Sequence, residues 1–219
     1  MKYDFLIFDL DGTISDPKKG IVRSMNAALK CHGFAERGEE ELSTLIGPPL
    51  DAAFAALVST TDSALIGSLV SKFRERYSDV GYSENVLYPG VAEALEQLSS
   101  ISDIQLGICT SKRVDFAERI LELFSLRHYF SFVNGGDVGI EKWQQLELLL
   151  EQGIISHHSL MIGDRYVDLA AAHKNNLHSV GVLWGYGSYS ELIQHKPMHI
   201  LSNPLELAGL AAGHGGLKY

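Results

Sequence analysis

The chain has 219 residues, of which 46% are hydrophobic and 21% charged, and this balance is ordinary for a globular protein. Its formal net charge of −9 argues against binding of a nucleic-acid polymer, because the phosphate backbone requires a basic footprint. No apolar run approaches the ~20 residues of a membrane span, and the N-terminus lacks the apolar stretch of a signal peptide. Cys31 and Cys109 lack the spacing of a metal site and suggest a reducing compartment, so we expect a cytoplasmic protein. Because no membrane span is present, we expect no binding to membranes.

The first apolar run of the chain ends in two acids. Residues 5–8 predict a buried strand, and Asp9, Asp11 and Gly12 follow it. Alternate residues of an extended segment point to the same side, so Asp9 and Asp11 can serve one reaction centre. An Asp-Gly turn would explain Asp11 but not Asp9. Two acids at this place are costly unless a cation or a reaction uses them.

The stretch from residue 16 to residue 82 predicts helices and no convincing strand. Asp16-Pro17 suits a helix start, with Asp16 as the cap and Pro17 in the first turn. Apolar residues then recur at helical spacing. Because this stretch separates the first strand from the others, we expect an inserted all-α cap domain at residues 16–82. Its expected helices cover residues 17–29, 51–58 and 65–77, and a rigid Gly-Pro-Pro loop covers residues 46–50.

Strand and helix patterns alternate in the rest of the chain. This alternation implies βαβ units and a parallel sheet. We therefore expect an α/β core domain formed by residues 1–15 and 83–219. The expected strands are 104–109, 130–133, 159–162 and 179–183, and the expected helices are 91–98, 114–124, 143–152 and 168–174.

Polar residues follow three of these later strands. Thr110 and Ser111 end the second strand, Lys142 opens the helix after the third, and Asp164 and Asp168 follow the fourth. Parallel sheets bind ligands at the carboxyl ends of their strands, so these residues can meet the Asp pair. Helix capping is the alternative for Thr110 and Asp164, and a solvated charge is the alternative for Lys142. Together, carboxylates, a hydroxyl and an ammonium suit Mg²⁺ and a phosphoryl group.

These four motifs resemble those of the haloacid dehalogenase-like hydrolase superfamily. The resemblance covers nearly the whole chain, and it implies a Rossmann-like parallel-sheet core with a small inserted α-helical cap. The matching residues are Asp9-Leu10-Asp11-Gly12-Thr13, Thr110, Lys142, and Gly163-Asp164 with Asp168. A finer resemblance, to the phosphoglycolate phosphatase branch and members described as 5′-nucleotidases, is carried by residues 46–50, 84–85, 88–91 and 163–165.

The resemblance implies catalytic roles for four residues. Asp9 would attack phosphorus and form an aspartyl-phosphate. Asp11 would protonate the leaving alcohol and then activate water for the second step. Thr110 and Lys142 would hold the transferring phosphoryl group. A neighbouring carboxylate and desolvation under a closed cap would raise the pKa of Asp11, so that it carries a proton at the first step.

The resemblance also implies a Mg²⁺ site and contacts to the substrate. Asp9, Asp164 and the backbone carbonyl of Asp11 would bind Mg²⁺, and Asp168 would support it through water. The partner would be a small phosphorylated metabolite, bound by a monomer or a homodimer. The expected substrate-binding residues are Gly12, Thr13, Gly47, Pro48 and Ser111, and further candidates from the cap are Arg23, Arg74 and Asn85.

We therefore expect a Mg²⁺-dependent phosphatase for small phosphate monoesters, with phosphoglycolate or a nucleoside 5′-monophosphate as the first candidates. A phosphosugar mutase or a pyrophosphatase of the same superfamily remains open, because both could share the motifs. Dehalogenation is disfavoured, because enzymes of that type need neither Asp11 nor Mg²⁺. A non-catalytic phospho-ligand-binding protein should have lost Asp9, Asp11, Lys142 or Asp164, and all four are present.

Overall fold

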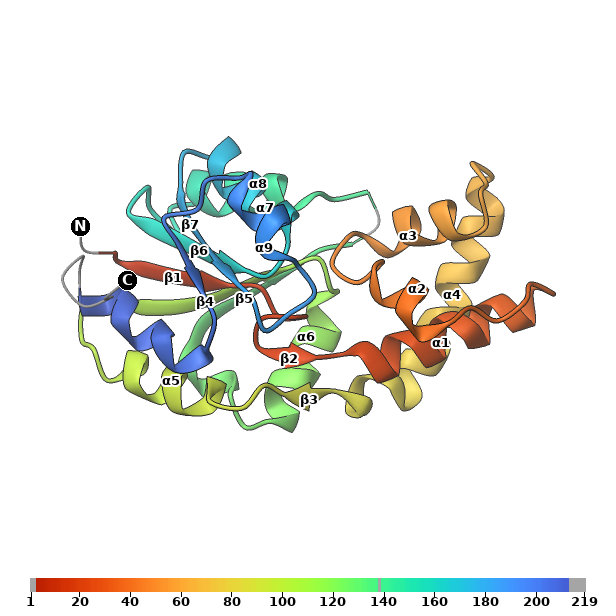
Figure 1. The fold of residues 1–219 in the computed structure, drawn as a ribbon, viewed down its shortest axis with the longest axis horizontal. Helices are drawn as coiled ribbons and strands as arrows, with labels where there is room; N and C mark the ends of the chain where they lie inside the picture. The colour runs from red at the N-terminus through yellow and green to blue at the C-terminus, as the bar shows by residue number, and fades with distance from the viewer. Residues whose placement is uncertain (1–2, 138, 213–219) are drawn as a thin grey trace.

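A parallel β-sheet forms the centre of the computed structural model, which describes residues 3–137 and 139–212 (Figure 1). Every pair of neighbouring strands in this sheet is parallel. β1 pairs with β4 on one side and with β6 on the other. The expected α/β core with a Rossmann-like parallel sheet is therefore confirmed. In spatial order, the strands are β5 (Phe130–Gly135), β4 (Gln105–Thr110), β1 (Phe5–Phe8), β6 (Ser159–Gly163), β7 (His178–Val182) and β8 (His199–Leu201).

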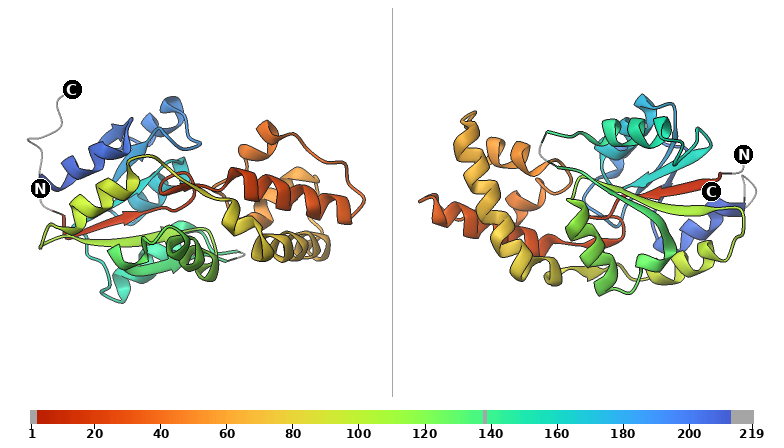
Figure 2. Two further views of the ribbon diagram at one scale, coloured as in Figure 1. Left: turned by 90° about the horizontal axis from the view of Figure 1, so that it is seen from below. Right: turned by 180° about the vertical axis from the view of Figure 1, so that it is seen from behind.

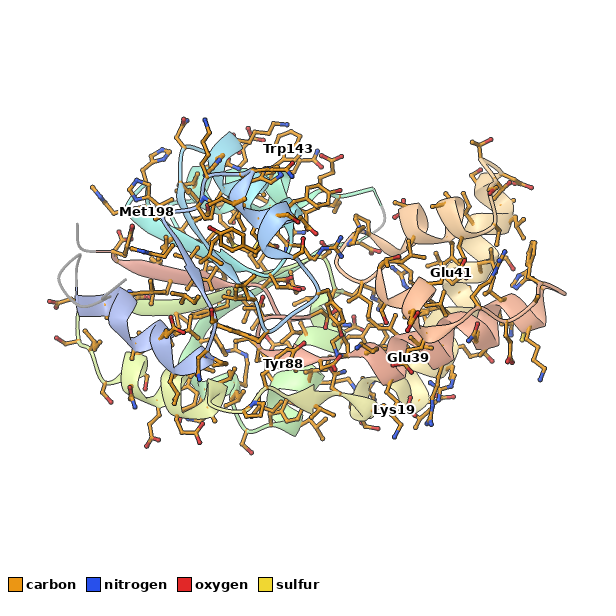
Figure 3. All side chains as sticks on the ribbon, in the orientation of Figure 1. Lys19, Glu39, Glu41, Tyr88, Trp143 and Met198 are labelled. Atoms are coloured by element: carbon orange, nitrogen blue, oxygen red, sulfur yellow. The ribbon has the colours of Figure 1, made fainter. Side chains whose placement is uncertain are left out.

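Helices cover both faces of this sheet, and side chains fill the layers between (Figures 2 and 3). Leu6 and Phe8 of β1 belong to the hydrophobic cluster that includes α5, α6 and the 3-10 helix η3. Ile7 points to the opposite face and joins the cluster that includes α7 and α8. The bounds are α5 (Val91–Ser99), α6 (Val114–Leu123), η2 (Arg127–Tyr129), α7 (Lys142–Glu151), α8 (Tyr166–Lys174), α9 (Tyr189–Ile193) and η3 (Pro204–Ala212).

Side chains cap the N-termini of α7 and α8, and α8 begins two residues before the predicted range of 168–174. Gln144 accepts a hydrogen bond from the backbone N–H of Glu141 at 2.9 Å, and α7 begins at Lys142. Asp168 accepts one from the backbone N–H of Arg165 at 3.0 Å, and α8 begins at Tyr166. The three-residue strand β8 is absent from the prediction, because so short a segment shows no clear alternation.

A group of helices lies beyond one end of the sheet (Figures 1 and 2). In the chain these helices come between β2 and β3, two short strands that pair with each other in antiparallel fashion. The apolar side chains of this group, Met25, Phe54 and Phe73 among them, form a separate hydrophobic cluster, which Phe116 of α6 joins from the sheet side. No helix in the described part of the chain combines the length and apolar composition of a transmembrane segment. The bounds are β2 (Ser15–Asp16), α1 (Lys18–Cys31), α2 (Glu39–Ser43), α3 (Leu50–Leu57), α4 (Ser63–Asp79), η1 (Gly81–Glu84) and β3 (Val86–Leu87).

The start of this helical insertion corrects the sequence prediction at Asp16. Asp16 belongs to β2, and α1 begins at Lys18 with Pro17 in the N-cap position. The Asp16 side chain still accepts a hydrogen bond from the backbone N–H of Lys18, at 2.9 Å. Strands β2 and β3 have two residues each, so neither shows a period in the sequence.

Candidate active site

The carboxyl ends of β1, β4 and β6 bring the predicted site residues together. Because β1 pairs with both β4 and β6, residues that follow these three strands are neighbours. Lys142 reaches the same place from the first turn of α7. The predicted catalytic and metal-binding residues are all buried, with exposed fractions of 3% for Asp9, 9% for Asp11, 1% for Thr110, 4% for Lys142, 0% for Asp164 and 0% for Asp168.

The ammonium group of Lys142 is held between two carboxylates. Its Nζ lies 2.9 Å from Oδ1 of Asp9, and it also donates a hydrogen bond to Oδ1 of Asp168. Burial alone would lower the pKa of Lys142, but the negative charges of Asp168 and Asp9 outweigh burial and raise it. Lys142 therefore stays charged beside Asp9.

Three carboxylates form a buried acidic cluster at this point. Asp9, Asp164 and Asp168 each offer one oxygen, and these atoms lie within 4.8 Å of one another. Burial and the charge of Asp9 raise the pKa of Asp168 to about 6, although Lys142 opposes this. Burial, with the charges of Asp168 and Asp9, raises the pKa of Asp164 well above its usual range. Three carboxylates beside one ammonium, that of Lys142, fit a divalent cation, since hard cations prefer oxygen ligands.

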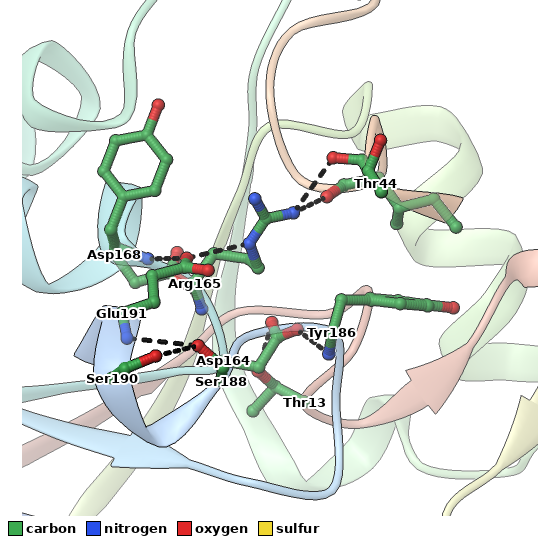
Figure 4. Close-up of polar contacts among 11 residues, drawn as sticks. Thr13, Thr44, Asp164, Arg165, Asp168, Tyr186, Ser188, Ser190 and Glu191 are labelled. Atoms are coloured by element: carbon green, nitrogen blue, oxygen red, sulfur yellow. Dashed lines mark hydrogen bonds and ion pairs between the residues drawn. The ribbon is translucent and has the colours of Figure 1, made fainter. Parts of the chain in front are cut away.

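The backbone around Asp164 holds its carboxylate in place (Figure 4). The backbone N–H of Tyr186 donates to Oδ2 of Asp164 at 2.8 Å, and Thr13 Oγ1 lies 3.4 Å from Oδ1. Gly12 has a φ of +86°, and a Cβ there would lie 2.2 Å from Asp164 Oδ2. Gly12 is therefore required both for the turn and for the close approach of this carboxylate. Gly12 and Thr13, which we expect to contact substrate, both lie against Asp164.

The side chain of Asp11 faces a different partner from the acidic cluster. Its Oδ2 lies 2.9 Å from Nζ of Lys112, whose side chain is also nearly buried. Its Oδ1 is buried without a hydrogen-bond partner among the described residues. Burial raises the pKa of Asp11 and the charge of Asp9 adds to this, whereas Lys112 opposes it. Asp11 therefore favours the protonated form more than an exposed Asp does.

A chain of hydrogen bonds links Lys112 to the helical insertion. Lys112 donates to the hydroxyl of Tyr77 on α4 at 2.9 Å. The Asn85 amide donates to the same hydroxyl at 3.2 Å, and Ser15 donates to Asn85 at 3.0 Å. Ser15 lies in β2 and Asn85 directly precedes β3, the two segments that connect the insertion to the rest of the protein. This series of hydrogen bonds therefore links Asp11 to both connecting segments. The sequence prediction missed Lys112 and Tyr77, although Lys112 directly follows the strand-end residues Thr110 and Ser111.

A cavity of about 90 Å³ separates the helical insertion from the carboxyl ends of the strands. Its polar wall includes Asp9, Asp11, Thr110 and Ser111, and the loop residues Gly47 and Pro48 close it from the insertion. Most of the remaining wall is apolar, with Ile21, Met25, Phe73 and Phe116. The predicted substrate contacts Gly47, Pro48 and Ser111 thus lie on the same cavity as the Asp pair.

Arg23, Arg74 and Asn85, the three further candidates for substrate contact, lie in different places. Arg74 lines the cavity and forms an ion pair with Asp137 at 2.6 Å. Arg23 pairs with Glu84 at 2.6 Å and is not among the residues found to line the cavity in the described structure. Asn85 is buried in the hydrogen-bond chain described above. Arg74 is therefore the one of the three placed to meet a ligand.

Comparisons with known proteins extend over nearly the whole chain. Residues 6–182 match a family model described as haloacid dehalogenase-like hydrolase. A 5′-nucleotidase from Pseudomonas aeruginosa is 34% identical, over 98% of both chains. A phosphoglycolate phosphatase from Aliivibrio fischeri is 30% identical, over 88% of this chain and 89% of the relative. The crystal structure of a predicted phosphatase from Clostridium acetobutylicum superposes with a TM-score of 0.89 at 31% identity, over 95% of this chain and 98% of that one.

Proposed function

Because the chain belongs to the haloacid dehalogenase-like hydrolase family and is one of its phosphatases, we propose that it hydrolyses small phosphate monoesters through an aspartyl-phosphate on Asp9, with Mg²⁺ as cofactor. The observation that carries this proposal is the position of Asp9, which lies in the acidic cluster, against Lys142 and on the wall of the cavity. Residues 16–82 would act as the cap over a core formed by residues 1–15 and 83–219.

In the first step, a carboxylate oxygen of Asp9 forms a bond to phosphorus, and the bond between phosphorus and the ester oxygen breaks. The leaving oxygen takes a proton from the Asp11 carboxyl group. The raised pKa of Asp11 supports this role, because a general acid must hold its proton until the transition state. Lys142 and Thr110 would hold the phosphoryl oxygens, since an ammonium and a hydroxyl both donate to them.

In the second step, the Asp11 carboxylate takes a proton from water, and the water oxygen forms a bond to phosphorus. The bond between phosphorus and Asp9 breaks, so inorganic phosphate leaves and the Asp9 carboxylate is restored. Asp11 then holds the proton that the next cycle uses. Lys112 would keep the Asp11 side chain oriented in both steps, by a hydrogen bond to the protonated carboxyl group and by an ion pair to the carboxylate.

Asp9, Asp164 and Asp168 would hold the Mg²⁺ ion, with the backbone carbonyl of Asp11 as a further ligand. When bound, Mg²⁺ supplies positive charge that neutralises the phosphoryl group and stabilises its transfer. The cluster fits this ion because its oxygens are close together and its carboxylates outnumber the nearby ammonium group.

A nucleoside 5′-monophosphate is the substrate that the cavity lining supports best. Phe73, Phe116 and Met25 offer apolar and aromatic surface to a nucleoside. Arg74, the wall residue that could meet the carboxylate of a smaller substrate, is paired with Asp137. Phosphoglycolate is the second candidate, because the cavity of about 90 Å³ suits a smaller leaving group.

Phosphate release from a substrate panel, with and without Mg²⁺, tests this proposal. The panel contains purine and pyrimidine 5′-monophosphates, phosphoglycolate, a sugar phosphate and pyrophosphate. We expect Mg²⁺-dependent release with a nucleoside monophosphate preferred. Conversion of a sugar phosphate to its isomer, preferential release from pyrophosphate, or binding of these compounds with no turnover would each contradict the proposal.

A further inference from the structure

One arginine connects the acidic cluster to the cap. Arg165 lies between Asp164 and Asp168 in the chain, at the N-terminus of α8. Its Nη1 donates to the backbone carbonyl of Ile46 at 2.6 Å and lies 3.5 Å from that of Thr44 (Figure 4). A side chain from the sheet end therefore bonds directly to the backbone of the helical insertion.

Glu191 on α9 fixes the orientation of this arginine. Nε of Arg165 donates to Oε1 of Glu191 at 3.0 Å, and the same oxygen accepts from the backbone N–H of Tyr166 at 2.9 Å. The Arg165 side chain is only 12% exposed. Because the donors of a guanidinium form a rigid planar fork, the bond to Glu191 also aims Nη1 at Ile46.

The loop that Arg165 reaches is the cap loop (residues 46–50), which begins at Ile46 and contains Gly47 and Pro48 of the cavity wall. Gly47 has a φ of +113°, and a Cβ at this position would lie 3.2 Å from Cγ of Arg165. The backbone of the cap loop thus packs closely on the arginine stem as well as accepting its hydrogen bond. Its position over the site depends on a residue of the core.

We propose that Arg165 is a positioning residue that holds the cap loop over the phosphoryl-transfer site. The carbonyl of Ile46 is the contact through which Arg165 fixes the cavity wall formed by Gly47 and Pro48. Arg165 would act on the leaving group only through this loop, so its removal should weaken substrate binding more than the chemical step. The kinetic part of this inference rests on the proposed phosphatase function, whereas the structural part does not.

Amide hydrogen exchange in the substrate-free protein tests the structural part. The backbone N–H groups of Leu45 and Ile46 bond to carbonyls of α2, at 3.1 and 3.2 Å, and report on the seating of the cap loop. In Arg165→Lys, one ammonium cannot replace the fork to Glu191 and Ile46, so exchange of these amides should rise about tenfold. Exchange at the parent rate would overturn the proposal.

Arg127 supplies a matched control within the core. Its Nε lies 2.5 Å from Oε2 of Glu118, and its Nη1 donates to the backbone carbonyl of Phe130 at 2.6 Å. Arg127→Lys thus removes the same kind of fork, at a place remote from the cap loop. It should leave exchange at Leu45 and Ile46 unchanged. An equal rise in both variants would mean that general destabilisation, and not the contact to Ile46, releases the loop.

Steady-state kinetics test the functional part on whichever substrate the parent prefers. Arg165→Lys should raise KM about tenfold, which is about 1.4 kcal/mol of binding, and change kcat by less than about threefold. Glu191→Ala should also raise KM, whereas Glu191→Gln should keep KM close to that of the parent. The rise in KM of the double variant Arg165→Lys/Glu191→Ala should be smaller than the two single effects combined. A fall in kcat at constant KM would overturn the positioning role. A parent without turnover would refute the proposed function, and the exchange result would still decide the contact.

Discussion

Removing one carboxylate from the acidic cluster of Asp9, Asp164 and Asp168 should stabilise the metal-free protein. In Asp164→Asn, the amide oxygen can still accept the hydrogen bond from Tyr186, but one negative charge is lost. The cluster then holds two carboxylates beside Lys142 instead of three. The same change should abolish binding at the proposed Mg²⁺ site, because an amide is a weaker ligand for Mg²⁺ than a carboxylate.

The size of the effect follows from the spacing of the oxygens. Two unit charges at 4.8 Å repel by about 3.5 kcal/mol at an effective dielectric constant of 20. Asp164 faces two such charges, those of Asp168 and Asp9, and is weakly attracted by Lys142. Because its raised pKa already relieves part of this repulsion, we expect a gain of about 1–3 kcal/mol. For a chain of this size, that gain corresponds to a rise in Tm of about 5 °C.

Thermal unfolding in a chelator and then in a Mg²⁺ series measures both effects. The parent should gain about 2.7 kcal/mol when Mg²⁺ reaches a hundred times its Kd, whereas Asp164→Asn should gain none. Asp79→Asn, on the exposed end of α4, is the control and should follow the parent in both conditions. The reasoning fails if metal-free Asp164→Asn unfolds below the parent, or if Mg²⁺ raises its Tm as it does that of the parent.

Three further predictions concern the same site. Asp11→Asn should lower kcat by about 10²–10⁴ in phosphate release and keep the rise of Tm in Mg²⁺, because its carboxylate faces Lys112; normal turnover would exclude Asp11 as the general acid. Tyr77→Phe should keep the ring stacked on Phe73 but lose the acceptor for Lys112, and kcat should fall about tenfold; an unchanged kcat would show that the bond does not orient Asp11. Because the pKa of Asp168 is raised from 3.8 to about 6 on folding, the folded protein binds the Asp168 proton more tightly than the unfolded chain does. The resulting contribution to the free energy of unfolding is complete below pH 3.8 and is lost as the pH rises through 6. The unfolding free energy of the metal-free parent, measured against Asp168→Asn, should therefore fall between pH 4 and 6, and a rise over this range would contradict the sign of the shift.

The sheet and the residues at its strand ends could be predicted because the local pattern carries both. Apolar runs of four to six residues identify the buried strands, and the rules for parallel sheets place their carboxyl ends together. Asp9, Thr110 and Asp164 follow such runs directly, so their neighbourhood needs no knowledge of side-chain contacts. Lys142 opens the helix that follows a strand, so its position in the chain also placed it near these residues, although a solvated surface charge remained the alternative.

The contacts between the helical insertion and the rest of the chain could not be predicted, because they depend on how two separately packed groups of helices and strands meet. Lys112 is not among the predicted site residues, and Arg165 enters the sequence analysis only as part of the motif at residues 163–165, yet each is nearly buried and bonded to the insertion. Their partners are the hydroxyl of Tyr77 and the carbonyl of Ile46, which lie tens of residues away in the chain. No periodicity of the sequence reports on a bond of this kind.

The aromatic contact between the two parts of the molecule affects the meaning of any measured KM. Phe116 of the core packs edge-on against Tyr77 of the insertion, with ring centroids 5.2 Å apart, and belongs to its hydrophobic cluster. Separating the two parts would expose both rings to water, and this cost disfavours separation. The cavity of about 90 Å³ is well below the roughly 300 Å³ at which ligand pockets begin, so a larger substrate would need the two parts to separate before it could enter. The rate of substrate binding, which enters KM, would then depend on the fraction of molecules in which the two parts are separated, and mutations at Phe116 should change that rate without touching the ligand.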